Sequence, residues 1–247
     1  IGTLLYAFIT KGKIPAYLGS SFAYLSPVLL LIGEGYDFKT IQGGFVATGL
    51  VFTLIAIIVK FTGTGWINKL FPPAAMGSIV AIIGLELASS AADMAGFPVG
   101  GSNTAEFNGT WVIVSMVTLA VVVFGNVLFR GFFKIIPILI GVIAGYIVAY
   151  FVGIVDFSQV KEASFFTLPN IQLAHFNIKA IATIIPATFV VIAEHIGHLK
   201  VTSSILGKDL TKDPGLHRSL LGDGLSTVVS GLFGSVPTTT YGENIGV

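Results

Sequence analysis

Two carboxylates in this chain lie in segments that carry few other charges. Glu194 lies within residues 181–198, a run of mostly aliphatic side chains, and Glu243 lies within the small and hydroxyl-bearing residues 237–246. His198 follows Glu194 by four positions, which puts both on one face of a helix. Such groups accept N–H hydrogen bonds and exchange protons. Their chemistry therefore fits binding of a polar ligand coupled to a proton.

The composition places these acids in lipid. Hydrophobic residues make up 54% of the chain and charged residues 10%, and the mean hydropathy is +0.91. An acid at the centre of a membrane helix costs about 2.5–3.5 kcal/mol on insertion scales, so it indicates a functional site. The net charge of +1 argues against nucleic acid as a partner, and the absence of cysteine excludes thiolate chemistry and Cys-based metal sites.

Runs of about 20 apolar residues predict a multi-pass protein of the cell inner (plasma) membrane. The links between them alternate in charge, and the positive-inside rule puts those at Lys11, Lys60, Arg130 and Lys200 in the cytoplasm. Because the sequence starts at Ile1 inside an apolar run, we expect a fragment of a longer chain. The predicted spans are residues 1–10 (the tail of a helix), 43–59, 73–95, 111–129, 135–152, 180–198 and a shorter 220–233.

Residues 17–27 and 237–247 do not fit a plain helix. Both are rich in glycine and hydroxyl side chains, followed by an aromatic and then a small residue. Many secondary transporters bind substrate at discontinuous helices in corresponding positions of two inverted repeats. The two segments are therefore either such a pair or two independent loops.

Four motifs in the second half of the chain give it a family resemblance. Residues 193–199, 212–219, 224–227 and 239–246 closely resemble the nucleobase-ascorbate transporter family, and within it the bacterial uracil permeases. The family signature opens with Gln or Glu, then Asn, any residue and Gly, which residues 243–246 match. The resemblance implies an all-α, polytopic fold of fourteen spans in seven-plus-seven inverted repeats, with short extended strands in spans three and ten.

The resemblance also implies a division into domains. Residues 1–63 would form part of the core domain (the end of span 2 and spans 3–4), and residues 64–153 part of the gate domain (spans 5–7). Residues 154–247 would be the core-domain part of the second repeat (spans 8–9 and the start of span 10). A homodimer is expected from the family.

By the same resemblance, Glu194, Glu243 and His198 bind the substrate together with the backbone amides of Phe22 and Gly242. Uracil offers two N–H donors and two carbonyl acceptors in one plane, which suits carboxylates and backbone N–H groups. Phe22 and Tyr241 can pack near a flat ring. Glutamate at 243 resembles the uracil permeases, whereas glutamine resembles many xanthine and urate carriers.

These residues predict a secondary transporter that imports uracil by proton symport. Glu194, His198 and Glu243 would share the coupling proton, with no cofactor and no metal, while sodium coupling stays open. The alternatives are a purine or xanthine permease of the same family, a cation channel, and a membrane enzyme that uses two carboxylates as acid and base.

Three further polar residues lie within the predicted spans or next to the matched motifs. His195 points about a quarter turn away from Glu194 and is expected to pack or hydrogen-bond. Glu86 is an intramembrane acid without an assigned role, and Asp223 serves either a turn or helix packing near the core.

Overall fold

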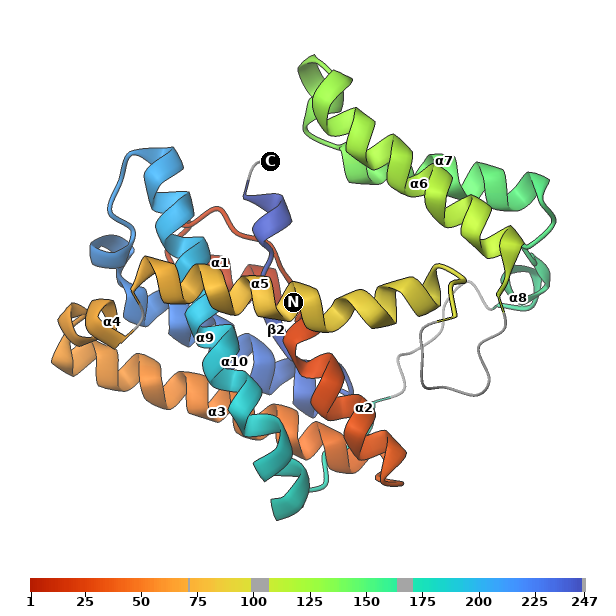
Figure 1. Ribbon diagram of the computed structural model, residues 1–247. Coiled ribbons are helices and arrows are strands. Elements are labelled where there is room, and N and C mark those ends of the chain that lie inside the picture. The colour runs from red at the N-terminus through yellow and green to blue at the C-terminus, as the bar shows by residue number, and fades with distance from the viewer. Residues whose placement is uncertain (71, 99–106, 164–170, 246–247) are drawn as a thin grey trace. The chain divides into compact units, whose positions relative to one another are not determined.

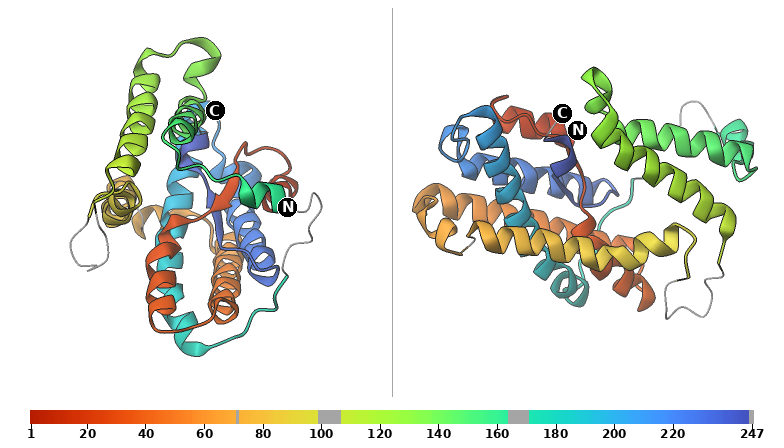
Figure 2. Two further views of the ribbon diagram at one scale, coloured as in Figure 1. Left: turned by 90° about the vertical axis from the view of Figure 1, so that its right-hand side faces the viewer. Right: turned by 45° about the horizontal axis from the view of Figure 1, so that its top comes forward.

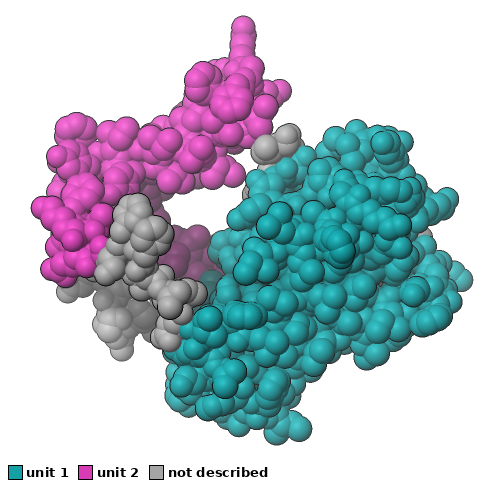
Figure 3. All heavy atoms as spheres, turned by 180° about the vertical axis from the view of Figure 1, so that it is seen from behind, with its two compact units in different colours: residues 1–83, 169–246 teal, residues 84–168, 247 magenta. Residues whose placement is uncertain are grey.

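The computed structural model describes residues 1–70, 72–98, 107–163 and 171–245 (Figure 1). Its contacts divide the chain into two compact units, one made of Ile1–Ile83 and Pro169–Gly246 and the other of Gly84–Leu168 (Figure 3). The assignment of residues 1–63, 64–153 and 154–247 to core and gate domains stays a prediction.

The first unit contains both segments that were predicted not to be plain helices, together with α9, which carries Glu194. Before the unit boundary its elements are α1 (Gly2–Ile9), β1 (Leu18–Ser20), the 3-10 helix η1 (Phe22–Tyr24), α2 (Leu25–Gly33), α3 (Phe38–Thr62), α4 (Gly65–Leu70) and the start of α5 (Pro73–Met94). After residue 169 they are α9 (Ile178–Leu206), η3 (Thr211–Gly215), α10 (Leu216–Leu232), β2 (Thr238–Thr240) and η4 (Gly242–Asn244).

The core of this unit is built around α3, which packs along α10 and α9, while α1 packs on α10. Glycines allow the close approach of α3 and α10. A Cβ on Gly49 would lie 2.6 Å from the backbone nitrogen of Val228, and one on Gly224 would lie 2.8 Å from Cβ of Phe52. Small residues at such contacts let membrane helices pack backbone to backbone.

The strands β1 and β2 pair antiparallel, with Leu18 opposite Thr240 and Ser20 opposite Thr238 (Figure 2). The Tyr241 amide extends the pairing by donating to the Tyr17 carbonyl at 3.1 Å. Because unpaired backbone groups are costly in an apolar setting, each strand satisfies polar groups that a helix would have satisfied internally. Each strand is followed by one residue and then a 3-10 helix, η1 or η4.

The second unit contains the remainder of α5 and a helical hairpin. Its α6 (Gly109–Leu128) and α7 (Pro137–Phe151) pack against each other and are joined through η2 (Gly131–Lys134), and α8 (Ser158–Glu162) follows. Gly141 and Gly145 face α6 so closely that a Cβ on either would overlap Val122 or Thr118.

Four helices within the described residues are long and apolar enough to cross a membrane: α3, residues 77–94 of α5, α6 and α9. Two shorter apolar helical segments cover residues 22–33 and 137–151. The predicted helical membrane architecture is confirmed, while the fourteen-span repeat and the numbering of spans three and ten stay predictions. Helices α3 and α9 extend beyond the predicted runs 43–59 and 180–198 at both ends, and they begin after the polar caps Asp37 and Asn177, whereas α7 is shorter than the predicted 135–152.

Candidate substrate site

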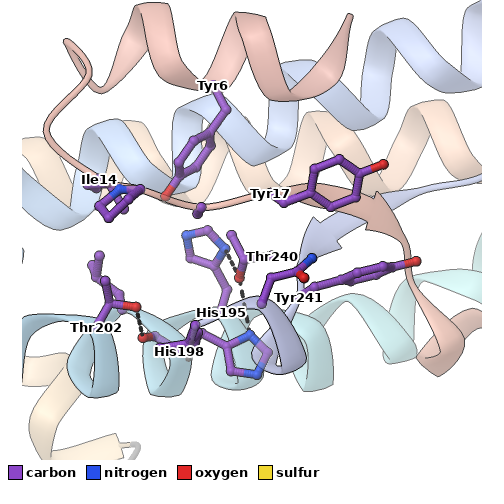
Figure 4. Close-up of a pocket in the computed structure, with 13 residues that line it drawn as sticks. Tyr6, Ile14, Tyr17, His195, His198, Thr202, Thr240 and Tyr241 are labelled. Carbon is purple, nitrogen blue, oxygen red and sulfur yellow. Dashed lines mark hydrogen bonds between the residues drawn. The ribbon is translucent and has the colours of Figure 1, made fainter. Parts of the chain in front are cut away.

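A pocket in the first unit lies where the β1–β2 pair meets α9 (Figure 4). One wall is the segment of residues 14–17 that leads into β1, and another is α9 with His195, His198 and Thr202. Thr240 and Tyr241 close it from the β2 side. Residues from both predicted irregular segments therefore line one cavity.

Glu194 and His198 lie one helical turn apart on α9, as their spacing predicts. Glu194 Oε1 is 3.9 Å from His198 Nε2, and the two side chains are 20% and 17% exposed. The other ring nitrogen, Nδ1, lies 3.2 Å from the Thr240 hydroxyl of β2 (Figure 4). The imidazole thus spans from the strand pair to the carboxylate.

Gly242 begins η4 directly beside this imidazole. A Cβ at this position would lie 2.7 Å from His198 Nε2, closer than side-chain carbons approach other atoms. Glycine therefore leaves room for the imidazole in this position, and the Nε2 of His198 faces both Glu194 and the backbone of η4.

Tyr241 forms an aromatic wall at the mouth of the pocket. Its ring centroid lies 5.8 Å from that of Tyr17, and its hydroxyl is 3.1 Å from Ser20 Oγ. A Cβ on Gly19 would lie 2.5 Å from its ring, so a glycine in β1 makes room for Tyr241.

The structure brings together Glu194, His198, Tyr241 and Gly242. Phe22 begins η1, which packs against α9, but its side chain is 61% exposed and does not line the pocket. The side chain of Glu243 lies outside the described part of the structure. The substrate-binding and proton-coupling roles of all six residues stay predictions.

A buried polar network lies behind the pocket. His195 is 1% exposed and Asp223 of α10 is fully buried, with Nδ1 of the histidine 2.9 Å from Oδ2 of the aspartate. The other ring nitrogen lies 2.7 Å from Ser219 Oγ, which in turn lies 2.7 Å from the Tyr6 hydroxyl. His195 therefore hydrogen-bonds, as expected.

Asp223 of α10 pairs with His195 of α9, a contact that the predicted turn or packing role does not include. The cost of an acid within a span, which singled out Glu194, was a signal for Asp223 as well. Its partner was not predictable, because His195 is on another helix. Thr240 was missed because a threonine in a polar segment carries no signal by itself.

Within the described ranges, no group of three or more His, Cys, Asp or Glu side chains is arranged to hold a metal ion. The polar side chains that line the pocket carry imidazole, hydroxyl and amide groups, and the Glu194 carboxylate lies 3.9 Å from the His198 imidazole. Such a set recognises a neutral polar molecule through hydrogen bonds and can hold protons.

The model of the Permease family matches residues 1–247. The chain is 60% identical to the uracil permease of Paenibacillus larvae and 59% identical to that of Escherichia coli K12, in each case over its whole length. It is 36% identical over its whole length to the putative pyrimidine permease RutG of E. coli K12, of which it covers 56%. It spans 59% of the first of these relatives and 57% of the second.

Proposed function

Since this chain belongs to the Permease family, which confirms the resemblance drawn from its motifs, we propose that the protein containing it imports uracil by proton symport. The matching relatives are named permeases, and the helices are those of an integral membrane protein. The proposed location is the cell inner (plasma) membrane, and the proposed mechanism is alternating access.

One observation supports the proposal most directly: His198, which lines a pocket shared by both irregular segments, lies next to Glu194 and to the backbone of Gly242. Glu194 and Glu243 would accept the two N–H groups of uracil. The backbone N–H groups at Phe22 and Gly242 would donate to its carbonyls, and Tyr241 would pack near the ring.

Proton coupling follows from the short distance between the titratable groups. Uracil and a proton compete for the same carboxylate oxygen atoms, so binding of one changes the occupancy of the other. His198 lies 3.9 Å from Glu194, so a charge on either group changes how readily the other holds a proton. Glu194, His198 and Glu243 thus share the coupling proton in this proposal, and no cofactor is required.

The repeated order of strand, single residue and 3-10 helix supports an inverted-repeat architecture. In this proposal, β1 belongs to span three and β2 to span ten of a fourteen-span protein. Residues 1–63 and 154–247 belong to the core domain and residues 64–153 to the gate domain. The transporter is proposed to be a homodimer.

The names of the relatives favour a pyrimidine over a purine or xanthine. Competition for radiolabelled uracil uptake by unlabelled uracil, xanthine and hypoxanthine tests this choice directly. Saturable uptake separates the transporter from a channel, and unchanged uracil recovered after uptake separates it from an enzyme.

The test of the proposed function is uracil uptake by the full-length protein in proteoliposomes with an inward proton gradient. Glu194→Gln and Glu243→Gln should each lower uptake roughly tenfold or more, the value of one charge-assisted hydrogen bond. Glu86→Gln is the matched control, since Glu86 is an exposed acid of α5. If Glu194→Gln and Glu243→Gln both keep wild-type uptake, the proposal is wrong. Uptake that needs a sodium gradient instead of a proton gradient refutes proton coupling.

A further inference from the structure

A chain of polar contacts connects α10 to the pocket through two histidines. Asp223 Oδ2 lies 2.9 Å from His195 Nδ1 as an ion pair, and hydrogen bonds join His195 Nδ1 to the Thr240 hydroxyl at 3.4 Å and that hydroxyl to His198 Nδ1 at 3.2 Å. Figure 4 shows Thr240 between the two imidazole rings. The inner part of this chain is closed to water, so its donors and acceptors must satisfy one another.

Asp223 determines which atom donates and which accepts in each contact of this network. An ionised carboxylate can only accept, so the His195 Nδ1 that faces Asp223 must carry a proton. The opposite nitrogen then accepts from Ser219, whose hydroxyl accepts in turn from Tyr6 at 2.7 Å. Both ring nitrogens of His195 therefore face a polar partner, Asp223 on one side and Ser219 on the other.

Thr240 connects the protonation of His195 to that of His198, because its hydroxyl contacts both rings. The single Nδ1–H of His195 faces both Asp223 Oδ2 at 2.9 Å and the Thr240 oxygen at 3.4 Å, so the threonine oxygen can only accept from it. The threonine O–H is then free to donate to Nδ1 of His198. A histidine whose Nδ1 accepts has its single proton on Nε2, the nitrogen that faces Glu194 and Gly242.

We propose that Thr240 is a positioning residue that, through His195 and Asp223, holds neutral His198 in the tautomer with its proton on Nε2. This tautomer presents an N–H donor to the pocket instead of a lone pair. The effect of this tautomer on uracil binding rests on the proposed function. The assignment of the tautomer rests only on the contacts of His198, Thr240 and His195.

Nitrogen-15 NMR of the full-length protein with labelled histidine tests the proposal, because protonated and unprotonated ring nitrogens give separate signals. His198→Gln identifies the signal of His198, and the spectra are taken at a pH where this residue is neutral. The wild type should show the proton on Nε2, and Thr240→Val should give a mixture of both tautomers. Thr240→Ser, which keeps the hydroxyl, should restore the wild-type spectrum.

Thr53→Val is the matched control, since within the described ranges the hydroxyl of Thr53 donates to the Gly49 carbonyl of its own helix and to no other group. It should leave the His198 signal unchanged. Thr240→Ala removes the same hydroxyl and replaces the valine variant if that protein does not fold. An unchanged Nε2 tautomer in the valine or alanine variant refutes the proposal, as does a wild-type signal from the Nδ1 tautomer.

Transport measurements separate this proposal from the proposed function. If uracil is the substrate, Thr240→Val should raise its KM roughly tenfold, the value of one hydrogen bond, and Thr240→Ser should recover most of the loss. A wild type that shows the predicted tautomer but moves no uracil contradicts only the proposed function. A wild type that transports uracil while Thr240→Val leaves the His198 tautomer unchanged contradicts only the positioning role.

Discussion

The two units of this chain differ in the residues that are buried inside each of them. Among the described residues, the fully buried polar and charged side chains all lie in the first unit, including His195, Asp223 and Ser219. In the second unit, the buried positions of α6 and α7 are Gly125, Pro137 and two further glycines. Both units use close helix packing, but among the described residues only the first adds a buried polar network. Substitutions in the first unit should therefore affect stability or binding, and packing substitutions in the second unit only stability.

The largest expected effect is the loss of the buried acid in the first unit. Asp223→Ala leaves His195 without its ionic partner, and breaking a buried pair costs about 3–5 kcal/mol. Thermal unfolding of the purified full-length protein should show a large fall in Tm or no folded protein. Asp223→Asn keeps an acceptor of the same shape and should lose much less, and equal losses in both variants would contradict the pairing.

Gly242→Ala should come next and should act on binding. Its Cβ would meet Nε2 of His198 at 2.7 Å and push the imidazole away from Glu194. We expect uracil uptake to fall roughly tenfold with little change in Tm, because a single hydrogen bond is misplaced. Gly33→Ala is the control, since a Cβ at Gly33 meets nothing within 4 Å. Wild-type KM in Gly242→Ala would show that the close approach has no role in binding.

A packing change in the second unit should lower thermal stability and leave uracil binding unchanged. Gly145→Leu forces a side chain against Thr118 of α6, and overpacking of this kind costs about 1–3 kcal/mol. The Tm should fall while the KM for uracil stays at the wild-type value. Gly84→Ala, in open space on α5, is the matched control. A KM that rises with Gly145→Leu would overturn the separation of roles between the units.

The smallest effect concerns an exposed ion pair of the first unit. Lys13 Nζ lies 2.6 Å from Asp213 Oδ1, and this hydrogen bond lowers the pKa of the Asp213 carboxyl. A carboxyl with a lowered pKa in the folded state stabilises the fold above its ordinary pKa, and this contribution is lost as the pH falls through the lowered value. Asp213→Asn should thus lower Tm slightly at pH 7, by about 1 °C or less given solvent screening. The difference from wild type should vanish in strong acid, and a difference that grows there would reverse the assigned sign.

Local relationships along one helix could be predicted from the sequence. The four-residue spacing of Glu194 and His198 places them on one face of α9, and the apolar runs located the membrane helices. Both depend only on helix geometry and composition.

Contacts between distant segments could not be predicted. Residues 17–27 and 237–247 were recognised as irregular, but nothing in either sequence indicates that Leu18 lies opposite Thr240. The pairing of His195 with Asp223 joins two helices whose relative rotation is set by glycine contacts along α3 and α10. Such geometry emerges only when the whole unit packs.

The pairing of β1 with β2 also constrains how the protein is made. Residues 21–237 separate β1 from β2, so the backbone edge of the first strand has no partner in the second until these residues have been synthesised. Closing such a long loop adds little entropic cost beyond that of a shorter one, but an open strand edge in lipid is costly. The strand pair, and with it the pocket that it forms with α9, can therefore assemble only after α9 and α10 have been made.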